Sequence, residues 1–148
     1  MERIWTKDIK SEFYQDGLKI RIKVFVDEQK VPLEEESDEY EKDCYHLILY
    51  KDNTTIATGR ILPLDSETVK FGRIAVTKEV RGTGLGKILM EEMEEKTREL
   101  GYQEIILGGQ VSAIPFYEKM GYTAYGDVFL DGGIDHRMMK KAIKQQRL

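Results

Sequence analysis

The chain has 148 residues, of which 41% are apolar and 34% charged, and its formal net charge is -4 at pH 7. This length supports one substantial core and is too short for two full domains, so we expect a single domain over residues 1–148. The acidic balance argues against nucleic acid as a partner, because binding to a phosphate backbone is driven by clustered lysine and arginine. The charged N-terminal residues do not fit a signal peptide and no apolar run could span a bilayer, so we expect a cytoplasmic protein without a membrane partner.

The chain contains two histidines and one cysteine, which restricts its chemistry. With Cys44 as the only thiol, no internal disulfide can form, and a structural role fits this residue better than a nucleophilic one. No set of His, Cys and carboxylate residues has the spacing of metal ligands. We therefore expect no bound metal.

Residues 1–32 are expected to form a short strand followed by one or two helices. Residues 4–6 fit a strand, and apolar residues recur at near-helical spacing from Phe13 to Val26. The helical part should end by Pro32, because proline lacks the amide donor and disfavours helix at the residue before it.

An acidic run follows at residues 34–43, where seven carboxylates are relieved by Lys42 alone. Such a block is expected to be a solvated, self-repelling surface loop. An alternative hypothesis is that it forms a rim that attracts a cationic amine substrate.

Strand patterns dominate the middle of the chain. Residues 44–50 and 55–62 are rich in branched and aromatic side chains and flank the turn signal Asp52-Asn53, which predicts a hairpin. A strand over residues 68–77 ends in the apolar run Ile74-Ala75-Val76, which is typical of burial on both faces. The later expected elements are a strand at 104–107, a helix at 113–120, and strands at 123–130 and 134–139 joined by a turn at Asp131-Gly132-Gly133.

Residues 85–100 have the pattern of an amphipathic helix, which Gly101 is placed to end. The face expected to be buried carries Leu85, Ile88, Leu89, Met93, Thr97 and Leu100. The residues expected to point largely outward are Glu91, Glu92, Glu94, Glu95 and Lys96.

A glycine-rich segment, residues 81–87, joins the strand at 68–77 to this helix. Amides at a helix N-terminus have no intrahelical partner, and glycines let an anion approach the backbone. A Walker A loop would need glycine at Arg81 and a hydroxyl residue at Ile88, and a dinucleotide fingerprint would need glycine at Lys87. We therefore expect a pyrophosphate-bearing ligand of another kind.

The segment Arg81-Gly82-Thr83-Gly84-Leu85-Gly86 resembles the acetyl-CoA motif of the GNAT family of N-acetyltransferases. Residues 113–122 resemble the motif around the fourth helix of that family, and residues 21–32 with 133–136 resemble its ElaA-like branch. The resemblance extends from the first strand to about Lys141. It implies an α/β GNAT fold with one mixed central sheet of about six to seven strands, about four flanking helices, and splayed fourth and fifth strands.

The resemblance also implies acetyl-CoA as the cofactor, with coenzyme A as the product. The pantetheine arm would pair with the backbone of residues 74–76, where an amide would also stabilise the oxyanion. Arg81 would add a charge directly or order the loop, and Gln110 replaces an asparagine found in many members, so its contact geometry departs from the family pattern. The implied cofactor-binding residues are Ile74, Ala75, Val76, Arg81, Gly82, Thr83, Gly84, Leu85, Gly86, Lys87, Gln110 and Phe116, with core packing as the alternative for Phe116.

The same resemblance implies Tyr117 as the catalytic acid that protonates the departing thiolate, because a phenol is normally protonated at neutral pH. Its alternative role is packing at a helix face. The general base stays open among Glu28, Asp127, Asp135 and His136. The acceptor, a small-molecule or peptide amine, is expected to contact Arg21, Phe25, Glu28 and His136.

The favoured hypothesis is an acetyl-CoA-dependent N-acetyltransferase that works by direct transfer in a ternary complex. Two alternatives are a catalytically silent acyl-CoA-binding module and an interaction domain that docks a basic partner on its acidic loop. The resemblance also leaves a homodimer possible, paired through the sheet or the C-terminal strands.

Overall fold

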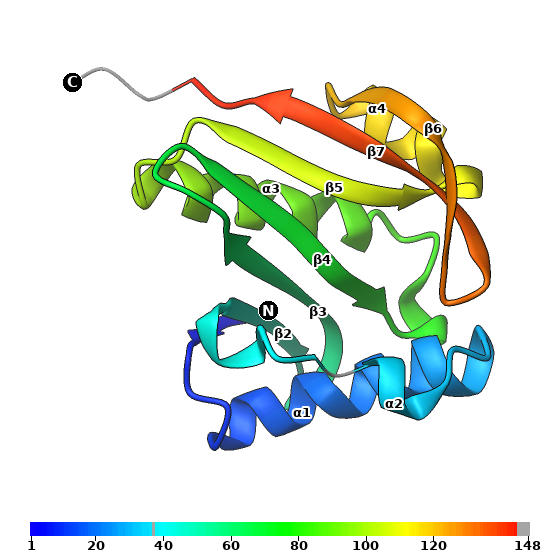
Figure 1. Ribbon diagram of the computed structural model, residues 1–148. Coiled ribbons are helices and arrows are strands. Elements are labelled where there is room, and N and C mark those ends of the chain that lie inside the picture. The colour runs from blue at the N-terminus through cyan, green and yellow to red at the C-terminus, as the bar shows by residue number, and fades with distance from the viewer. Residues whose placement is uncertain (37, 145–148) are drawn as a thin grey trace.

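The computed structural model describes residues 1–36 and 38–144, and its centre is a mixed seven-stranded sheet (Figure 1). The strand order is β1-β2-β3-β4-β5-β7-β6, and only the β4–β5 pair is parallel. The strands are β1 (Glu2–Thr6), β2 (Tyr45–Lys51), β3 (Thr54–Pro63), β4 (Thr68–Val76), β5 (Glu104–Gln110), β6 (Thr123–Asp131) and β7 (Ile134–Ala142). The α-helices of the described residues are α1 (Glu12–Arg21), α2 (Leu33–Glu36), α3 (Leu85–Glu99) and α4 (Ile114–Lys119). The expected mixed α/β architecture is confirmed.

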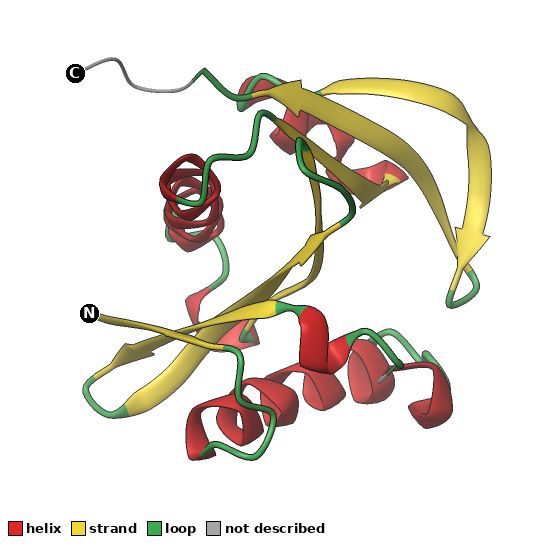
Figure 2. Cartoon of the chain, turned by 60° about the vertical axis from the view of Figure 1, so that its left-hand side comes forward, coloured by secondary structure: helices red, strands yellow, loops and turns green. Residues whose placement is uncertain are grey.

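Helices cover both faces of the sheet (Figure 2). The main core lies under α3, where Leu89 and Met93 pack with Phe71 and other fully buried side chains of the strands. On the other face α1 approaches β3 so closely that a Cβ on Gly17 would lie 2.9 Å from the Thr58 hydroxyl. The sheet is therefore the middle layer of three.

The sheet opens between β4 and β5. These strands pair only from Thr68 to Phe71 on β4 and from Glu104 to Leu107 on β5, and beyond these residues they diverge. The pairing of β4 with β3 is interrupted at the same level, where Arg73 has a φ of 50°. This bulge bends the end of β4 away from β5 and leaves its backbone groups on that side without a strand partner.

The N-terminal helical segment ends beside this opening. Ser11 caps α1 by accepting the amide of Tyr14, and the helix continues into a π-helix over Ile22–Glu28. A π-helix is rare and occurs frequently at functional sites. The segment ends before Pro32, as predicted.

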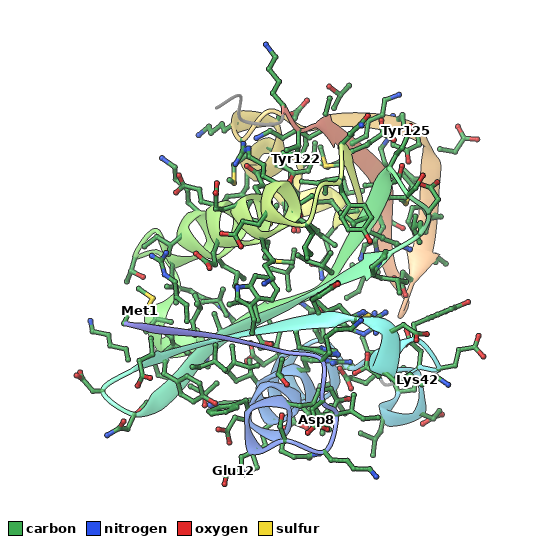
Figure 3. The ribbon with its side chains drawn as sticks, turned by 90° about the vertical axis from the view of Figure 1, so that its left-hand side faces the viewer. Met1, Asp8, Glu12, Lys42, Tyr122 and Tyr125 are labelled. Atoms are coloured by element: carbon green, nitrogen blue, oxygen red, sulfur yellow. The ribbon has the colours of Figure 1, made fainter. Side chains whose placement is uncertain are left out.

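The amphipathic helix is confirmed as α3, but one of its glutamates was placed wrongly. Glu94 is only 5% exposed, because the Tyr122 hydroxyl donates to it at 2.8 Å and Lys141 Nζ lies 3.0 Å from its carboxylate. Figure 3 shows Tyr122 beside α3. A glutamate can be buried when its charge is paired and hydrogen-bonded in this way, and helical periodicity alone does not reveal such pairing.

The prediction of a solvated acidic loop is wrong for its central residues. The segment forms α2 and a 3₁₀ turn over Glu41–Asp43, and Glu36 and Glu41 are buried. The Arg21 side chain, 2% exposed, lies 2.5 Å from each of these two carboxylates. Arginine side chains from α1 and β3 thus take the place of water around the buried carboxylates of the segment. Lys42 lies near α2, at the end of the molecule away from Tyr122 (Figure 3).

No helix in the described ranges is long and apolar enough to cross a membrane. Cys44 is buried, and burial raises the pKa of its thiol to about 11. A thiol in this state is almost entirely protonated at neutral pH, which fits the structural role expected of it.

Candidate active site

A cavity of about 350 Å³, here named the central cavity, lies where β4 and β5 diverge. Its walls come from the π-helix, from the diverging ends of β4 and β5, from α4, and from the β6–β7 hairpin. Its lining includes Val24, Phe25, Gln29, Val31, Arg60, Lys70, Arg73, Ile74, Ala75, Val76, Arg81, Gly108, Gln110, Tyr117, Phe129, Asp131, Gly132, Ile134 and His136. The divergence of the sheet therefore produces a long cleft rather than a closed pocket.

The glycine-rich loop leads into α3 beside one end of the central cavity. Gly82 and Gly84 have φ values of 81° and 84°, and a Cβ at either position would meet no atom within 4 Å. Gly84 caps α3 without a side-chain hydrogen bond, so the first amides of a 15-residue helix face outward. The Thr83 hydroxyl donates to the Val80 carbonyl at 2.6 Å and fixes the loop. This loop, here named the anion cradle, has a geometry that could hold an anion.

The other expected loop residues are divided between this cradle and the core. Leu85, the first residue of α3, is buried on the inner face of the helix, whereas Lys87 is exposed in the same turn. Phe116 is 37% exposed and packs edge-on against Tyr117, so its placement in the core is wrong. Its ring lies over Gly86, where a Cβ would be 3.5 Å away.

Two contacts join the end of the π-helix to the cleft. Arg81 lies 2.7 Å from the Glu28 carboxylate, and its Nε donates to the Val76 carbonyl at 3.0 Å. The Gln110 side chain donates to that of Gln29 at 3.0 Å, across the divergence of the strands. Arg81 therefore links the glycine-rich loop to the π-helix and to β4, and the Gln110 side chain reaches from β5 to the end of the π-helix.

Tyr117 lies on α4 and reaches the central cavity over Gly109, where a Cβ would be 3.2 Å from the ring. Burial raises the pKa of its phenol to about 12. The hydroxyl is therefore protonated throughout the neutral range and can act as a proton donor.

His136 also lines the central cavity and stacks on Phe129 at 5.8 Å between ring centroids. Its Nδ1 lies 2.7 Å from the Ile134 carbonyl, which can only accept a hydrogen bond. We therefore assign the proton of the neutral ring to Nδ1, which leaves Nε2 with its lone pair. Asp127 and Asp135 are exposed and are not among the lining residues.

The expected acceptor residues fall into two groups. Phe25 and His136 line the central cavity, whereas Glu28 lies beside it on Arg81. Arg21 is buried beneath α2 and does not line the cavity, which argues against the substrate contact expected from the sequence.

Three lining cations were missing from the sequence-based site: Arg60, Lys70 and Arg73. A signal for one of them existed, because Arg73 stands where the alternation of Val69 and Phe71 calls for an apolar residue.

Of the β6–β7 hairpin only His136 was expected at the site, whereas Phe129, Asp131 and Ile134 also line the cavity. At the hairpin tip a Cβ on Gly132 would lie 2.8 Å from the Val31 side chain.

Comparison with known proteins agrees with this geometry. The acetyltransferase (GNAT) domain family matches residues 8–143. YjcF of Bacillus subtilis, an uncharacterized N-acetyltransferase, is 39% identical over 131 residues, which cover 88% of this chain and 93% of that protein. ElaA of Escherichia coli is 31% identical over 132 residues, 86% of each chain.

Two solved structures share the fold. The structure of Escherichia coli ElaA superposes with a TM-score of 0.82 at 27% identity, covering 95% of this chain and 99% of that one. An acyl-CoA N-acyltransferase from Pseudomonas aeruginosa gives a TM-score of 0.85 at 27% identity, covering 96% and 100%. Fold and site thus define a protein of the acyltransferase class. The chain belongs to the GNAT family of acetyltransferases.

Proposed function

We propose that the protein transfers an acetyl group from acetyl-CoA to a primary amine of a small molecule or peptide, by direct attack in a ternary complex. One observation carries this proposal: one cavity is lined by the end of β4 that β5 does not pair, by Tyr117, by the cations of β3 and β4, and by Arg81 at the start of the glycine-rich loop. Donor, proton source and acceptor can therefore meet in one place.

The chain offers a matching feature for each part of acetyl-CoA, the acetyl donor. The cradle at Gly82 and Gly84 is open for a pyrophosphate, and the first turn of α3 supplies amides and the positive end of a helix dipole. The backbone of residues 74–76 would hold the pantetheine arm as an added strand, because β5 does not pair with this part of β4. When bound, acetyl-CoA would supply an activated acetyl thioester.

Three groups of the chain would then act on the reaction. A backbone amide at Ile74 or Val76 would donate to the acetyl oxygen as negative charge develops there. Tyr117 would give its proton to the departing sulfur, since the raised pKa keeps that proton in place at neutral pH. His136 would accept the proton of the attacking amine at Nε2, because Nδ1 is hydrogen-bonded to the Ile134 carbonyl. The three carboxylates considered as the base are less suitable, since two lie outside the cavity and Glu28 is paired with Arg81.

The test is calorimetric titration of acetyl-CoA into the protein, followed by measurement of thiol release with a panel of amines. Binding followed by release that falls strongly in Tyr117→Phe supports an acetyltransferase. Binding without release from any amine supports the alternative of a silent acyl-CoA-binding module. Failure of acetyl-CoA to bind would overturn the proposal.

A further inference from the structure

Three carboxylates of the acidic segment, Glu36, Asp38 and Glu41, are paired with arginines of the protein. Arg21 pairs with Glu36 and Glu41 at 2.5 Å, and Arg60 pairs with Asp38 at 2.7 Å and also with Glu41. Hydrogen bonds from Arg21 lower the pKa of Glu41 against the effect of burial, which alone would raise it. These carboxylates therefore cannot act as the rim for a cationic amine that the sequence suggested.

Arg73 differs from the other two arginines of this cluster. It is 24% exposed and lines the central cavity, and its Nε donates to the main-chain oxygen of Glu36 at 2.9 Å. Its carboxylate neighbours are more distant, at 3.4 Å for Asp38 and 4.0 Å for Glu36. The Arg73 guanidinium is consequently the most exposed of the three, and it faces the cavity.

The pKa directions agree with this geometry. Carboxylate contacts raise the pKa of Arg21 and of Arg60 although burial opposes them. Burial, followed by the neighbouring Arg60 and Arg21, lowers the pKa of Arg73. An anion bound in the cavity beside Arg73 would favour the charged form of this guanidinium.

The backbone of Arg73 has an unusual conformation. A φ of 50° is unusual for a residue other than glycine, and such strain concentrates at functional sites. The next residue, Ile74, begins the β4 edge proposed to hold the pantetheine arm. An anion on Arg73 would therefore lie close to the point of acetyl transfer.

A second cation, Lys70, lies in the same wall of the cavity as Arg73. Lys70 is exposed on β4 and lines the same cavity. Among the described residues, the carboxylates that line it are Glu36, whose side chain is 1% exposed and pairs with Arg21, and Asp131 at the hairpin tip. The wall formed by β3 and β4 is thus cationic.

We propose that the acceptor carries, besides its amine, an anionic group such as a carboxylate or a phosphate, which Arg73 and Lys70 bind. This inference rests on the proposed function, because it names the class of amine that the same cavity takes. The two kinds of anion share the chemistry of charge-assisted hydrogen bonding to a guanidinium.

Matched amines test the inference by turnover. β-Alanine is compared with β-alaninamide, and O-phosphoethanolamine with ethanolamine, so that the two pairs separate carboxylate from phosphate. We expect kcat/KM for the anionic member of at least one pair to be about tenfold higher or more, the advantage of a hydrogen bond to a charged group. Equal turnover of the members of both pairs would overturn the inference.

Variants locate the effect. Arg73→Gln should bring the preferred ratio close to one, and Arg73→Lys should keep part of it. Because Arg73 also touches the buried cluster, the exposed Lys70→Gln provides a second variant, expected to lower the ratio severalfold without affecting folding. Lys51→Gln, exposed on β2, is the matched control and should leave the ratio unchanged. A ratio that neither Arg73→Gln nor Lys70→Gln alters would place the anion elsewhere.

A binding readout separates this inference from the proposed function. Propionate, propionamide and inorganic phosphate are titrated calorimetrically into the protein, with and without saturating coenzyme A. Preferential binding of propionate or phosphate, lost in Arg73→Gln or Lys70→Gln, supports the anion site even if no amine releases thiol. Thiol release from amines together with no anion preference in either readout would refute the anion site and leave the acetyltransferase standing.

Discussion

Arg81 of the glycine-rich loop and Glu28 at the end of the π-helix form an ion pair of 2.7 Å. The hydrogen bond from Gln110 to Gln29 is a second tie between the same helical segment and the cleft. Both ties use residues expected to meet the donor, one near its phosphates and one near its pantetheine arm. Binding of the donor at these residues would therefore be coupled, through the two contacts, to the position of the segment that carries Phe25.

The Glu28 contact should compete with the donor for Arg81. The hydrogen bond from Arg81 lowers the pKa of Glu28, which therefore stays ionised at neutral pH. In Glu28→Gln we expect the Kd for acetyl-CoA to fall about two- to fivefold at low salt, the range that an exposed ion pair allows. Calorimetry with Asp27→Asn as the matched neighbouring carboxylate measures this. Weaker binding in Glu28→Gln would mean that Arg81 serves only to order the loop.

Replacement of Tyr117 by phenylalanine should separate chemistry from binding. The ring and its packing over Gly109 remain, so the Kd for acetyl-CoA should not change. Loss of the proton donor should reduce kcat about 10²-fold or more. Because the phenol titrates only near pH 12, this loss should be constant between pH 7 and 10. Tyr125→Phe serves as the control, and a Tyr117→Phe rate within threefold of the wild type would assign the tyrosine to packing alone.

His136→Gln tests the proposed general base through pH. At neutral pH most of an alkylamine is protonated, since its pKa is about 10.4, so removal of the base should lower kcat/KM about 10²-fold. As the pH approaches the pKa of the amine, the base is needed less and the variant should approach the wild type. Asp135→Asn, an exposed neighbour, should follow the wild-type profile. A deficit that stays constant with pH would indicate a structural role for His136.

The fold could be predicted largely because its signals are local. Gly84 precedes the apolar stripe of α3, Asp52-Asn53 separates two strands, and the glycine-rich loop directly follows β4. Each of these patterns lies within a few consecutive residues, and backbone sterics give it one preferred structure. The glycine-rich loop lies within such a pattern, whereas Tyr117 was expected from the family resemblance of residues 113–122.

The acceptor side could not be predicted in the same way. The acidic segment shows only its charge in the sequence, whereas its burial depends on Arg21 and Arg60, which come from α1 and β3. Likewise, the Arg73 side chain enters the cavity because of a bulge formed by pairing with β3. Contacts between distant elements carry no periodic pattern, so this part of the site required the fold.

The buried ion cluster should be essential for stability. Glu41→Gln leaves Arg21 and Arg60 beside a neutral amide, and breaking a buried ion pair costs about 3–5 kcal/mol. Urea unfolding measures the free energy. Glu39→Gln changes the same charge at an exposed position of the segment and should alter stability by less than about 0.5 kcal/mol. Equal effects of the two substitutions would show that the cluster adds no stability.

The same cluster predicts a dependence of stability on pH. The folded-state pKa values of Glu41 and Asp38 are lowered, because hydrogen bonds from Arg21 and Arg60 outweigh burial. The unfolded chain then binds protons before the folded one, so the contribution is complete above the unfolded pKa values of about 4 and is lost as the pH falls through the lower folded values. We expect the wild-type free energy of unfolding to decline below about pH 4 and this decline to be smaller in Glu41→Gln. If the free energies of unfolding of the wild type and of Glu41→Gln decline in parallel as the pH falls, the cluster is not the source of the acid sensitivity.

The tip of the β6–β7 hairpin offers a test of the cavity wall through two adjacent glycines. Gly132 and Gly133 have φ values of 59° and 79°, so a side chain at either should cost roughly 1–2 kcal/mol of backbone strain. Only at Gly132 would a Cβ also collide with the Val31 side chain, at 2.8 Å, whereas at Gly133 it would meet nothing within 4 Å. The Gly133→Ala variant therefore controls for strain.

Gly132→Ala should consequently lose about 1–3 kcal/mol more stability than Gly133→Ala, the usual cost of overpacking, unless the hairpin moves off Val31. If it moves, the excess loss is small, but the wall of the central cavity is displaced and KM for the amine rises severalfold in Gly132→Ala alone. Urea unfolding and acceptor kinetics on the two variants distinguish these responses. Identical stability and identical KM in both variants would mean that the Val31–Gly132 contact does not form the wall of the acceptor site.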